Sequence, residues 1–305
     1  MSFFNIVRGA CARIAGEALY VRVEADRIEA YARTLAPSFA DTPMVLDPAL
    51  HYVEPEHDPE GTAAFVLTLD SVNFGSGWFP DIFGPAASGY TAVANRLNTQ
   101  FRQHGALPPE RLADLTLQDS LALFGLDPAN PAAVELGGLY ASALNDLGRF
   151  VVDTYGGRYL DLVAAADGSA ERLTSILWRM PLFEDSPFYK RAQITAADLA
   201  LSGIAAFTDL GRLTAFADNL LPHVLRHDGV LTYGHDLAER IDRGEFIPSG
   251  SREETEMRAA AVHAVERLSA ALGVPAVLVD RVLWHRGQRP EYRAKPRHRT
   301  KTAHY

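Results

Sequence analysis

The chain has 305 residues, of which 48% are hydrophobic, and its formal net charge at neutral pH is -9. This length and hydrophobic content are enough for a well-filled core, which excludes a largely disordered chain. The acidic charge disfavours broad binding to nucleic acid, and the single cysteine, Cys11, excludes an intramolecular disulfide and a cysteine-based metal site.

Membrane segments are not expected. No window approaches the roughly 18 consecutive apolar residues that a membrane span needs. Arg8 and Arg13 interrupt the apolar N-terminal run, which therefore does not resemble a signal peptide. We expect a soluble, cytoplasmic protein without a membrane partner.

Strand signals are sparse and lie in the N-terminal part. The run from Ala63 to Leu69 is rich in Phe, Val, Thr and Leu, which predicts a strand. It leads into DSVNFGSGWFPDIFGP (70–85), whose glycines and prolines predict a loop. Residues 1–87 are therefore expected to form a small elaboration with few strands.

Amphipathic helices dominate the remainder. The clearest covers 253–273, where Met257, Ala261 and Leu268 share one face; Ser251 and Glu254 resemble a capping box at its start, and Gly273 ends it. Similar patterns predict helices over 22–36, 88–103, 108–124, 131–154, 157–165, 170–178, 192–205, 212–227 and 234–243. We expect a mainly α protein, one compact helical domain spanning residues 1–305.

The C-terminal segment from Asp280 to Tyr305 is basic. It carries eight lysines and arginines against two acidic residues, whereas the rest of the chain is strongly acidic. Two interpretations stay open: a solvated basic tail, or a site for one phosphate group.

Common catalytic motifs are absent. The sequence has no GxxxxGK[ST], GxSxG or HExxH, and no convincing GxGxxG. His223 and His227 have helical i, i+4 spacing, but without a matching third ligand we interpret them as partly exposed helix histidines rather than a metal site.

The stretch Phe188–Leu225 combines charged residues with small apolar ones. Within it, Asp218 lies between Phe216 and an apolar Leu-Leu-Pro run, where an unpaired charge is costly. One interpretation is a helix-capping aspartate. The other is a carboxylate in a dry pocket, where its weakly screened charge would stabilise a cationic transition state.

Several long blocks resemble one known family. FYKRAQITAADL, LTAFADNLLPHVL, LTYGHDLAERIDRGEFIPSGSREETEMRAAAVHAVERL and HRTKTAHY, together with DPALHYV, LTLDSVNFGSGWFP and VLVDRVLWHR, are similar to the queuosine salvage protein family. Its members release the base queuine from queuosine 5'-phosphate. The resemblance runs from about residue 45 to the end and is weaker in the middle.

The resemblance implies a helical fold distantly similar to the helix-hairpin-helix DNA glycosylases. Lys190, the pair Ala197 and Asp198, and Asp218 follow the order of the lysine, the Ala-Asp pair and the catalytic aspartate of those enzymes. The Gly-rich hairpin that grips DNA is missing. With the acidic net charge, this favours a free nucleotide over a stable nucleic-acid partner.

The resemblance also implies roles around the base. It assigns His51, Phe216 and Asp280 to the base and Asp218 to the ribose, as nucleophile or as stabiliser of an oxocarbenium-like sugar. We expect Phe216 to stack on the base, and Asp280 to accept hydrogen bonds from its guanine-like edge. For His51, contact with the polar side arm of queuine and a satisfied loop histidine both stay open.

The roles of Arg281, of His285 and of the cation that binds the phosphate stay open. Arg281 and His285 stand where the family pattern has a tyrosine and an aspartate, which puts their contacts with the cyclopentene part of queuine in doubt. For the 5'-phosphate we prefer Lys190 over Arg191, because adjacent helical residues face different ways; a basic residue of the C-terminal segment is an alternative. The chemistry requires no metal and no cofactor.

The expected activity is therefore an N-glycosyl hydrolase that releases queuine for salvage into tRNA modification. Two alternatives remain: a nucleic-acid base glycosylase with Lys190 as amine nucleophile, and a non-catalytic protein that binds a modified base or tRNA. The sequence does not distinguish the 5'-phosphate from the nucleoside as substrate, nor define the oligomeric state.

Overall fold

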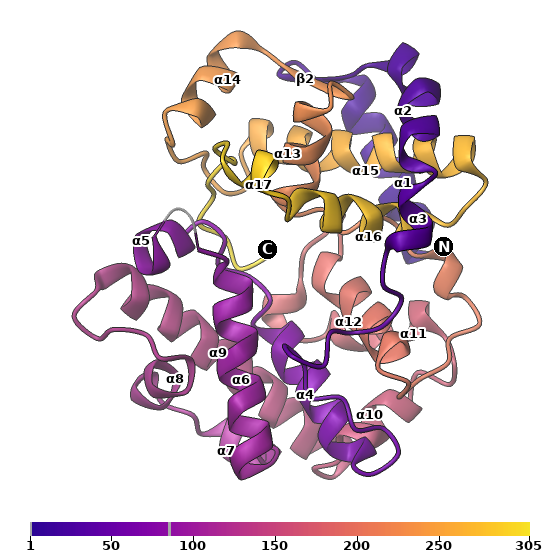
Figure 1. Ribbon diagram of the computed structural model, residues 1–305. Helices are drawn as coiled ribbons and strands as arrows, with labels where there is room; N and C mark the ends of the chain where they lie inside the picture. Colours follow the sequence, from indigo (N-terminus) through magenta and orange to yellow (C-terminus); the bar gives the residue numbers. More distant parts are fainter. Residues whose placement is uncertain (1, 85–86) are drawn as a thin grey trace.

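The computed structural model describes residues 2–84 and 87–305. Within these ranges the chain forms seventeen α-helices and one two-stranded sheet, which confirms the mainly α fold class (Figure 1). The elements are α1 (Phe3–Gly16), β1 (Val21–Val23), α2 (Ile28–Leu35), α3 (Ser38–Asp41), α4 (Pro59–Ser71), α5 (Phe79–Phe83), α6 (Gly89–His104), α7 (Pro109–Ala113), α8 (Leu117–Phe124), α9 (Pro131–Tyr155), α10 (Tyr159–Ala164), α11 (Ala170–Leu177), α12 (Lys190–Leu201), α13 (Leu220–His227), β2 (Leu231–Tyr233), α14 (His235–Asp242), α15 (Arg252–Leu272), α16 (Ala276–Gly287) and α17 (Pro290–Arg293).

Buried apolar side chains form two clusters. The first core is built mainly by α4 and α6 to α12, in the lower half of Figure 1. The second core is built by α1, α2 and α13 to α16, in the upper half. In the described ranges no single helix is long and apolar enough to cross a membrane; only α15 and α16 together meet that criterion, with a bend of 111° between them.

The predicted strand at 63–69 is wrong, because these residues lie in the middle of α4. Asp58 caps this helix by accepting the N–H of Gly61 at 2.9 Å, and Pro59 occupies its first turn. The helix packs against α6, α9, α10 and α12, so that Gly61 to Ser71 are all buried. A continuously apolar run does not separate a strand from a helix buried on every side.

The N-terminal residues pack into both cores. Helix α1 packs on α15, and β1 pairs antiparallel with β2, with Val21 opposite Tyr233. Helix α4 meanwhile belongs to the first core. The division of the chain near residue 87 stays a prediction, and residues 85–86 lie outside the described ranges.

Most predicted helices are confirmed with small shifts of their ends. The exceptions have local causes. The segment 108–124 is interrupted where Thr116 and Asp119 form a capping box that starts α8. The segment 22–36 begins with β1, and the predicted loop 70–85 contains α5, although its last residue is not described. The first half of 212–227 is not α-helical, and α1 and α16 were not predicted.

The N-terminus of α15 follows only half of the predicted capping box. Ser251 accepts the N–H of Glu254 at 3.2 Å, as predicted. The Glu254 carboxylate instead accepts the N–H of Gly250 at 3.2 Å. At the other end, Gly273 has φ +67° and closes the helix, as predicted.

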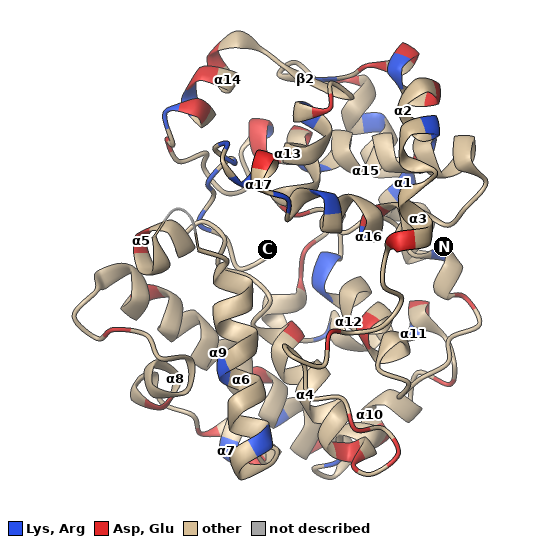
Figure 2. Cartoon of the chain, viewed as in Figure 1, with Lys and Arg blue, Asp and Glu red and all other residues tan. Residues whose placement is uncertain are grey.

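Of the two open interpretations of the C-terminal segment, the solvated tail is contradicted at residues 298–305, where every side chain except that of Lys301 is at least partly buried. His298, Thr300, Thr302 and Tyr305 are buried, and the tail ends between the two halves of the molecule (Figure 1). Gly75 donates its N–H to the Tyr305 carbonyl at 3.1 Å. Figure 2 shows basic residues of this region on α16 and around α17. The C-terminal segment therefore contacts residues of the first core from the second-core side.

Candidate active site

The loop Leu213–Asn219 precedes α13 and carries Asp218. Elements distant in sequence hold it by hydrogen bonds, so its shape depends on the tertiary fold rather than on local propensity. The contacts are Thr214 N–H to Gln193 Oε1 on α12 (2.9 Å), Phe216 N–H to Asp280 Oδ1 on α16 (2.9 Å), Arg258 Nε on α15 to the Ala217 carbonyl (2.9 Å), and Asn219 Nδ2 to the His298 carbonyl of the tail (3.4 Å).

Asp218 caps helix α13. Its Oδ1 accepts the N–H of Leu220 at 2.8 Å and that of Leu221 at 2.9 Å. The capping interpretation is therefore confirmed. It is compatible with catalysis, because both contacts use one oxygen and fix the orientation of the other, Oδ2. The side chain is half-buried, which weakens solvent screening of its charge.

Two cations lie within electrostatic reach of Asp218. Lys190, the first residue of α12, is 3% exposed, and its Nζ donates to the Asn73 carbonyl at 3.1 Å. Burial lowers the pKa of Lys190, and the attraction of Asp218 opposes that effect. Arg297 is half-buried; burial lowers its pKa, and Asp218 again opposes.

Asp280 is buried on α16, and burial raises its pKa to about 8. The N–H of Phe216 and the charges of Lys190 and Arg281 oppose this shift, whereas Asp218 adds to it. At neutral pH the carboxyl group of Asp280 is thus mostly protonated in the free protein. Phe216 is half-buried against the first core.

A second pair of carboxyl groups comes from the first core. Asp70 on α4 is buried, and burial followed by the neighbouring charge of Asp198 raises its pKa. Burial raises the pKa of Asp198 on α12 to about 6, opposed by Arg281 and Lys190. Asp198 and Asp280 both interact electrostatically with Lys190 and Arg281, so Asp198 belongs to the same charged site. Asp70 was not predicted, because it lies in the run interpreted as a strand leading into a loop.

His51 is buried with both ring nitrogens satisfied. Nδ1 lies 2.8 Å from the Asp47 carbonyl and Nε2 lies 2.8 Å from the Tyr90 hydroxyl. Burial lowers its pKa, so the ring is neutral near pH 7. These contacts fit a satisfied loop histidine, and its contact with substrate stays a prediction. Tyr90, which also packs edge-on against Trp284, gave no signal in the sequence.

Arg281 and His285 lie one turn apart on α16. The guanidinium of Arg281 donates to the carbonyls of Pro43 and, at 2.7 Å, Val45. It thereby holds the 43–45 segment against α16. The ring of His285 contacts that of Trp284, and burial lowers its pKa. The charge of Arg281 also acts on Asp198 and Asp280.

Arg191 has a structural environment. Its Nη1 donates to the Ser71 carbonyl at 2.6 Å, and the guanidinium lies over the rings of Phe74 and Phe183. It therefore faces the first core, while Lys190 lies within electrostatic reach of Asp218, as the helical geometry predicted for adjacent residues.

The histidine pair on α13 does not form a metal site with the groups around it. His223 is buried, which corrects the prediction of partial exposure, and its Nε2 bonds to the Tyr292 carbonyl at 2.9 Å. In residues 2–84 and 87–305 no group of three His, Cys, Asp or Glu side chains is arranged to hold a metal ion.

Known proteins of one family are similar to this chain over nearly its whole length. A family model described as "Queuosine salvage protein" matches residues 52–305. Three relatives share the name queuosine 5'-phosphate N-glycosylase/hydrolase. The protein from Sphaerobacter thermophilus is 35% identical, covering 96% of this chain and 95% of its own length. That from Mus musculus is 27% identical (93% and 94%), and that from Dictyostelium discoideum is 30% identical (81% and 79%).

Proposed function

The chain belongs to the queuosine salvage protein family, and we propose that it hydrolyses the N-glycosidic bond of queuosine 5'-phosphate, releasing queuine for salvage into tRNA modification. The observation that carries this proposal is the half-buried Asp218 carboxylate, oriented by α13 and flanked by Lys190. Its chemistry fits the reaction in the name of the relatives.

Asp218 acts on the ribose. When the bond between ribose C1' and the base breaks, its electron pair leaves with the base, and positive charge develops on the sugar. The Oδ2 atom of Asp218 stabilises that charge or attacks C1' to form a short-lived ester. In both cases water finally supplies the new oxygen on C1' and a proton to the base, so the products are ribose 5'-phosphate and queuine.

Asp280 and Phe216 bind the base. The 7-deazaguanine ring has no N7 to protonate, so leaving-group assistance must come from its other polar atoms. An ionised Asp280 accepts from the ring NH and the exocyclic NH2, which present two parallel donors. Because its pKa is about 8 in the free protein, this mode requires loss of the Asp280 proton when the base binds. The exposed part of the Phe216 ring stacks on the base.

The 5'-phosphate meets cations beside Asp218. Lys190 uses acceptors on Asn73, at 3.1 Å for the carbonyl and 3.5 Å for Oδ1, and its ammonium has a third N–H for a ligand. Arg297 of the C-terminal segment is a second cation near the same carboxylate. The family pattern puts His51 near the side arm, whereas Arg281 and His285 depart from that pattern, and their contacts with the cyclopentene part stay open.

The substrate is a free nucleotide. The charge of the chain is negative, and the reaction needs only the nucleotide and water, with no metal or cofactor. We propose that the protein acts on the free mononucleotide in the cytoplasm, rather than on a stably bound nucleic acid or at a membrane.

The test is chromatographic detection of queuine after incubation of purified protein with queuosine 5'-phosphate or queuosine, without added metal. Asp218→Asn should lower turnover by about a hundredfold or more, since it removes charge stabilisation of the transition state. Asp209→Asn is the matched control: Asp209 also caps a helix, accepting the N–H of Ala170 at 2.6 Å, but that helix is α11 and not α13. It should keep its activity.

The outcomes separate the candidate functions. Release of queuine by wild type and Asp209→Asn alone would support the hydrolase. Queuine binding without release would instead indicate a binding protein, and borohydride trapping of a modified oligonucleotide would indicate a glycosylase that uses Lys190 as nucleophile.

A further inference from the structure

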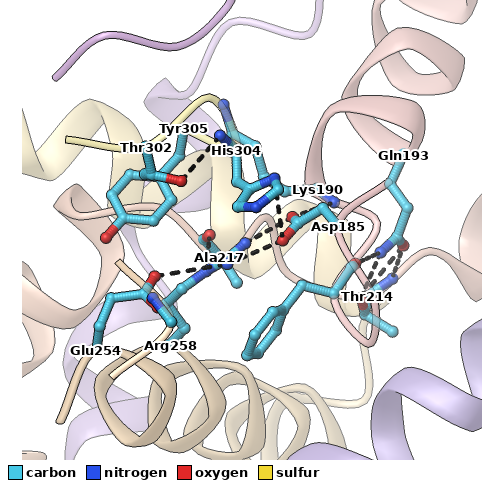
Figure 3. A network of polar contacts seen from close by, with 12 residues as sticks. Asp185, Lys190, Gln193, Thr214, Ala217, Glu254, Arg258, Thr302, His304 and Tyr305 are labelled. Carbon is cyan, nitrogen blue, oxygen red and sulfur yellow. Dashed lines mark hydrogen bonds and ion pairs between the residues drawn. The ribbon is translucent and has the colours of Figure 1, made fainter. Parts of the chain in front are cut away.

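Arg258, in the second turn of α15, is 2% exposed, and all three nitrogens of its guanidinium donate hydrogen bonds (Figure 3). Nε donates to the Ala217 carbonyl at 2.9 Å. Nη1 and Nη2 donate to the two oxygens of Asp185 at 2.9 and 2.6 Å. This bidentate geometry is specific to arginine.

The two contacts of Arg258 reach the two sides of the candidate active site. The Ala217 carbonyl belongs to the peptide that joins Ala217 to Asp218. On the other side, Asp185 Oδ2 also accepts the backbone N–H of Lys190 at 3.3 Å. The Arg258–Asp185 pair thus connects the peptide before Asp218 with the N-terminus of α12, which begins at Lys190.

The surroundings restrict movement of this pair. The guanidinium lies 4.0 Å from the ring centroid of Phe188 and 4.9 Å from that of Tyr305. Glu254, one turn earlier on α15, lies 3.5 Å from Nη1, and His304 lies 3.8 Å from Asp185. Burial lowers the pKa of His304, so this histidine is neutral at pH 7. Because His304 adds no positive charge, the Asp185 and Glu254 carboxylates balance the charge of Arg258.

Stability alone is a weak reason for this arrangement. Transferring two charges into the interior costs several kcal/mol per ion, and well-packed apolar residues are often as stable as a buried pair. An apolar pair at these positions would, however, lose the directional contacts to the Ala217 carbonyl and to the N–H of Lys190. The polar pair adds directional contacts beside Asp218 and at Lys190 themselves, whereas the other link between this loop and α12 joins Thr214 to Gln193.

We propose that Arg258 and Asp185 are positioning residues for the hydrolysis: they hold Asp218 and Lys190 at the separation that the transition state requires. The inference rests on the proposed function. Since neither side chain needs to touch the substrate, their loss should affect turnover more than substrate binding.

The test compares Arg258→Lys and Asp185→Asn with wild type. Lysine keeps the charge but not the fork, so it cannot bond both Ala217 and the two Asp185 oxygens. We expect kcat for queuosine 5'-phosphate to fall about 10- to 100-fold, because displacements of about 1 Å in an active site have effects of that size. The fall in kcat should exceed any rise in KM for the nucleotide, and queuine, which lacks the phosphate that Lys190 is proposed to bind, should bind with nearly unchanged affinity.

Glu256→Gln is the matched control on the same helix. Glu256 is 2% exposed on its side chain and pairs with Arg252 at 2.8 Å, while accepting the N–H groups of Leu19 and Tyr20, away from the Asp218 loop. It should lower the thermal unfolding midpoint without changing kcat. A merely structural role for Arg258 predicts the same pattern for Arg258→Lys, and that result would overturn the proposal.

Three further outcomes decide the remaining cases. If neither Arg258→Lys nor Asp185→Asn folds, the pair is required for folding and the positioning role is rejected. If wild type releases queuine and Asp218→Asn keeps the wild-type rate, the assignment of Asp218 fails first. If Asp218→Asn is inactive but both folded pair variants keep the wild-type kcat, the proposed function stands and only this inference fails.

Discussion

Asp280 accepts the backbone N–H of Phe216 through Oδ1 at 2.9 Å, two residues before Asp218. Helix α16 therefore fixes the loop that carries the candidate catalytic carboxylate. The same contact leaves Oδ2 of Asp280 as the atom that holds the proton when this buried group is neutral. The protonation state of this side chain is thus linked to the stability of the loop and to the base binding proposed for Asp280.

Asp280 should make the fold less stable at high pH. Its folded-state pKa of about 8 lies above the value of about 3.9 for an unfolded aspartate, so the folded state keeps a proton that the unfolded state releases between these values. This contribution is fully present below pH 4 and is lost as pH rises through 8. Asp280→Asn removes it while retaining an acceptor for Phe216.

The measurement is urea unfolding of wild type and Asp280→Asn at pH 5, 7 and 9. The free energy of unfolding of the variant, relative to wild type, should increase over this range by about 1 kcal/mol or more. A pH-independent difference would show that Asp280 is already ionised in the folded protein.

Lys190→Met should weaken recognition of the phosphate. Methionine retains much of the side-chain volume but removes the ammonium group, so KM for queuosine 5'-phosphate should rise about tenfold or more, with a smaller change for the nucleoside queuosine. Steady-state kinetics with both substrates measures this selectivity. If KM for both substrates is unchanged, Lys190 does not bind the phosphate, and Arg297→Met becomes the next variant.

The sequence pattern predicted helices correctly where one face of the helix is apolar. It gave wrong elements where a segment is buried on every side or is held by distant hydrogen bonds. Helix α4 is buried on all sides, and its apolar run carries no helical period to recognise. The loop 213–219 has the opposite problem, because its apolar residues continue the period of α13 although hydrogen bonds from other elements hold it in a non-helical shape.

The candidate site was predictable only in part. Asp218 and Lys190 were identified, since both lie in one recognisable stretch. Arg258 and Asp185 are 73 residues apart and meet only through packing of α15 on the segment before α12, so no local pattern marks them as a pair. Tyr90 was missed for the same reason, as its hydroxyl reaches the loop residue His51 from helix α6.

Arg281→Ala should release the 43–45 segment. Its guanidinium is the group that bonds the carbonyls of Pro43 and Val45, and both Met44 and Val45 are otherwise exposed. We expect faster proteolysis at this segment and a higher KM. The control is Arg102→Ala, which removes a 3.2 Å hydrogen bond to the Pro48 carbonyl in the same connection. Equal cleavage rates at 43–45 in wild type and Arg281→Ala would contradict the prediction.

Gly77→Ala should displace the C-terminal tail, because a Cβ at this position would lie 2.2 Å from the Thr300 carbonyl oxygen, a backbone atom that has little room to move. The displacement would also disturb Tyr305, whose ring stacks on Arg258. We expect the thermal unfolding midpoint to fall by several degrees, corresponding to about 1–3 kcal/mol, together with a lower kcat. Gly9→Ala, in the exposed middle of α1 with no atom within 4 Å of the new Cβ, should instead raise the midpoint, since alanine favours the helix by about 0.5–1 kcal/mol. We therefore expect calorimetry to show unfolding midpoints that shift in opposite directions in the two variants. A stable Gly77→Ala protein with normal turnover would show that the tail does not need its close approach to Gly77.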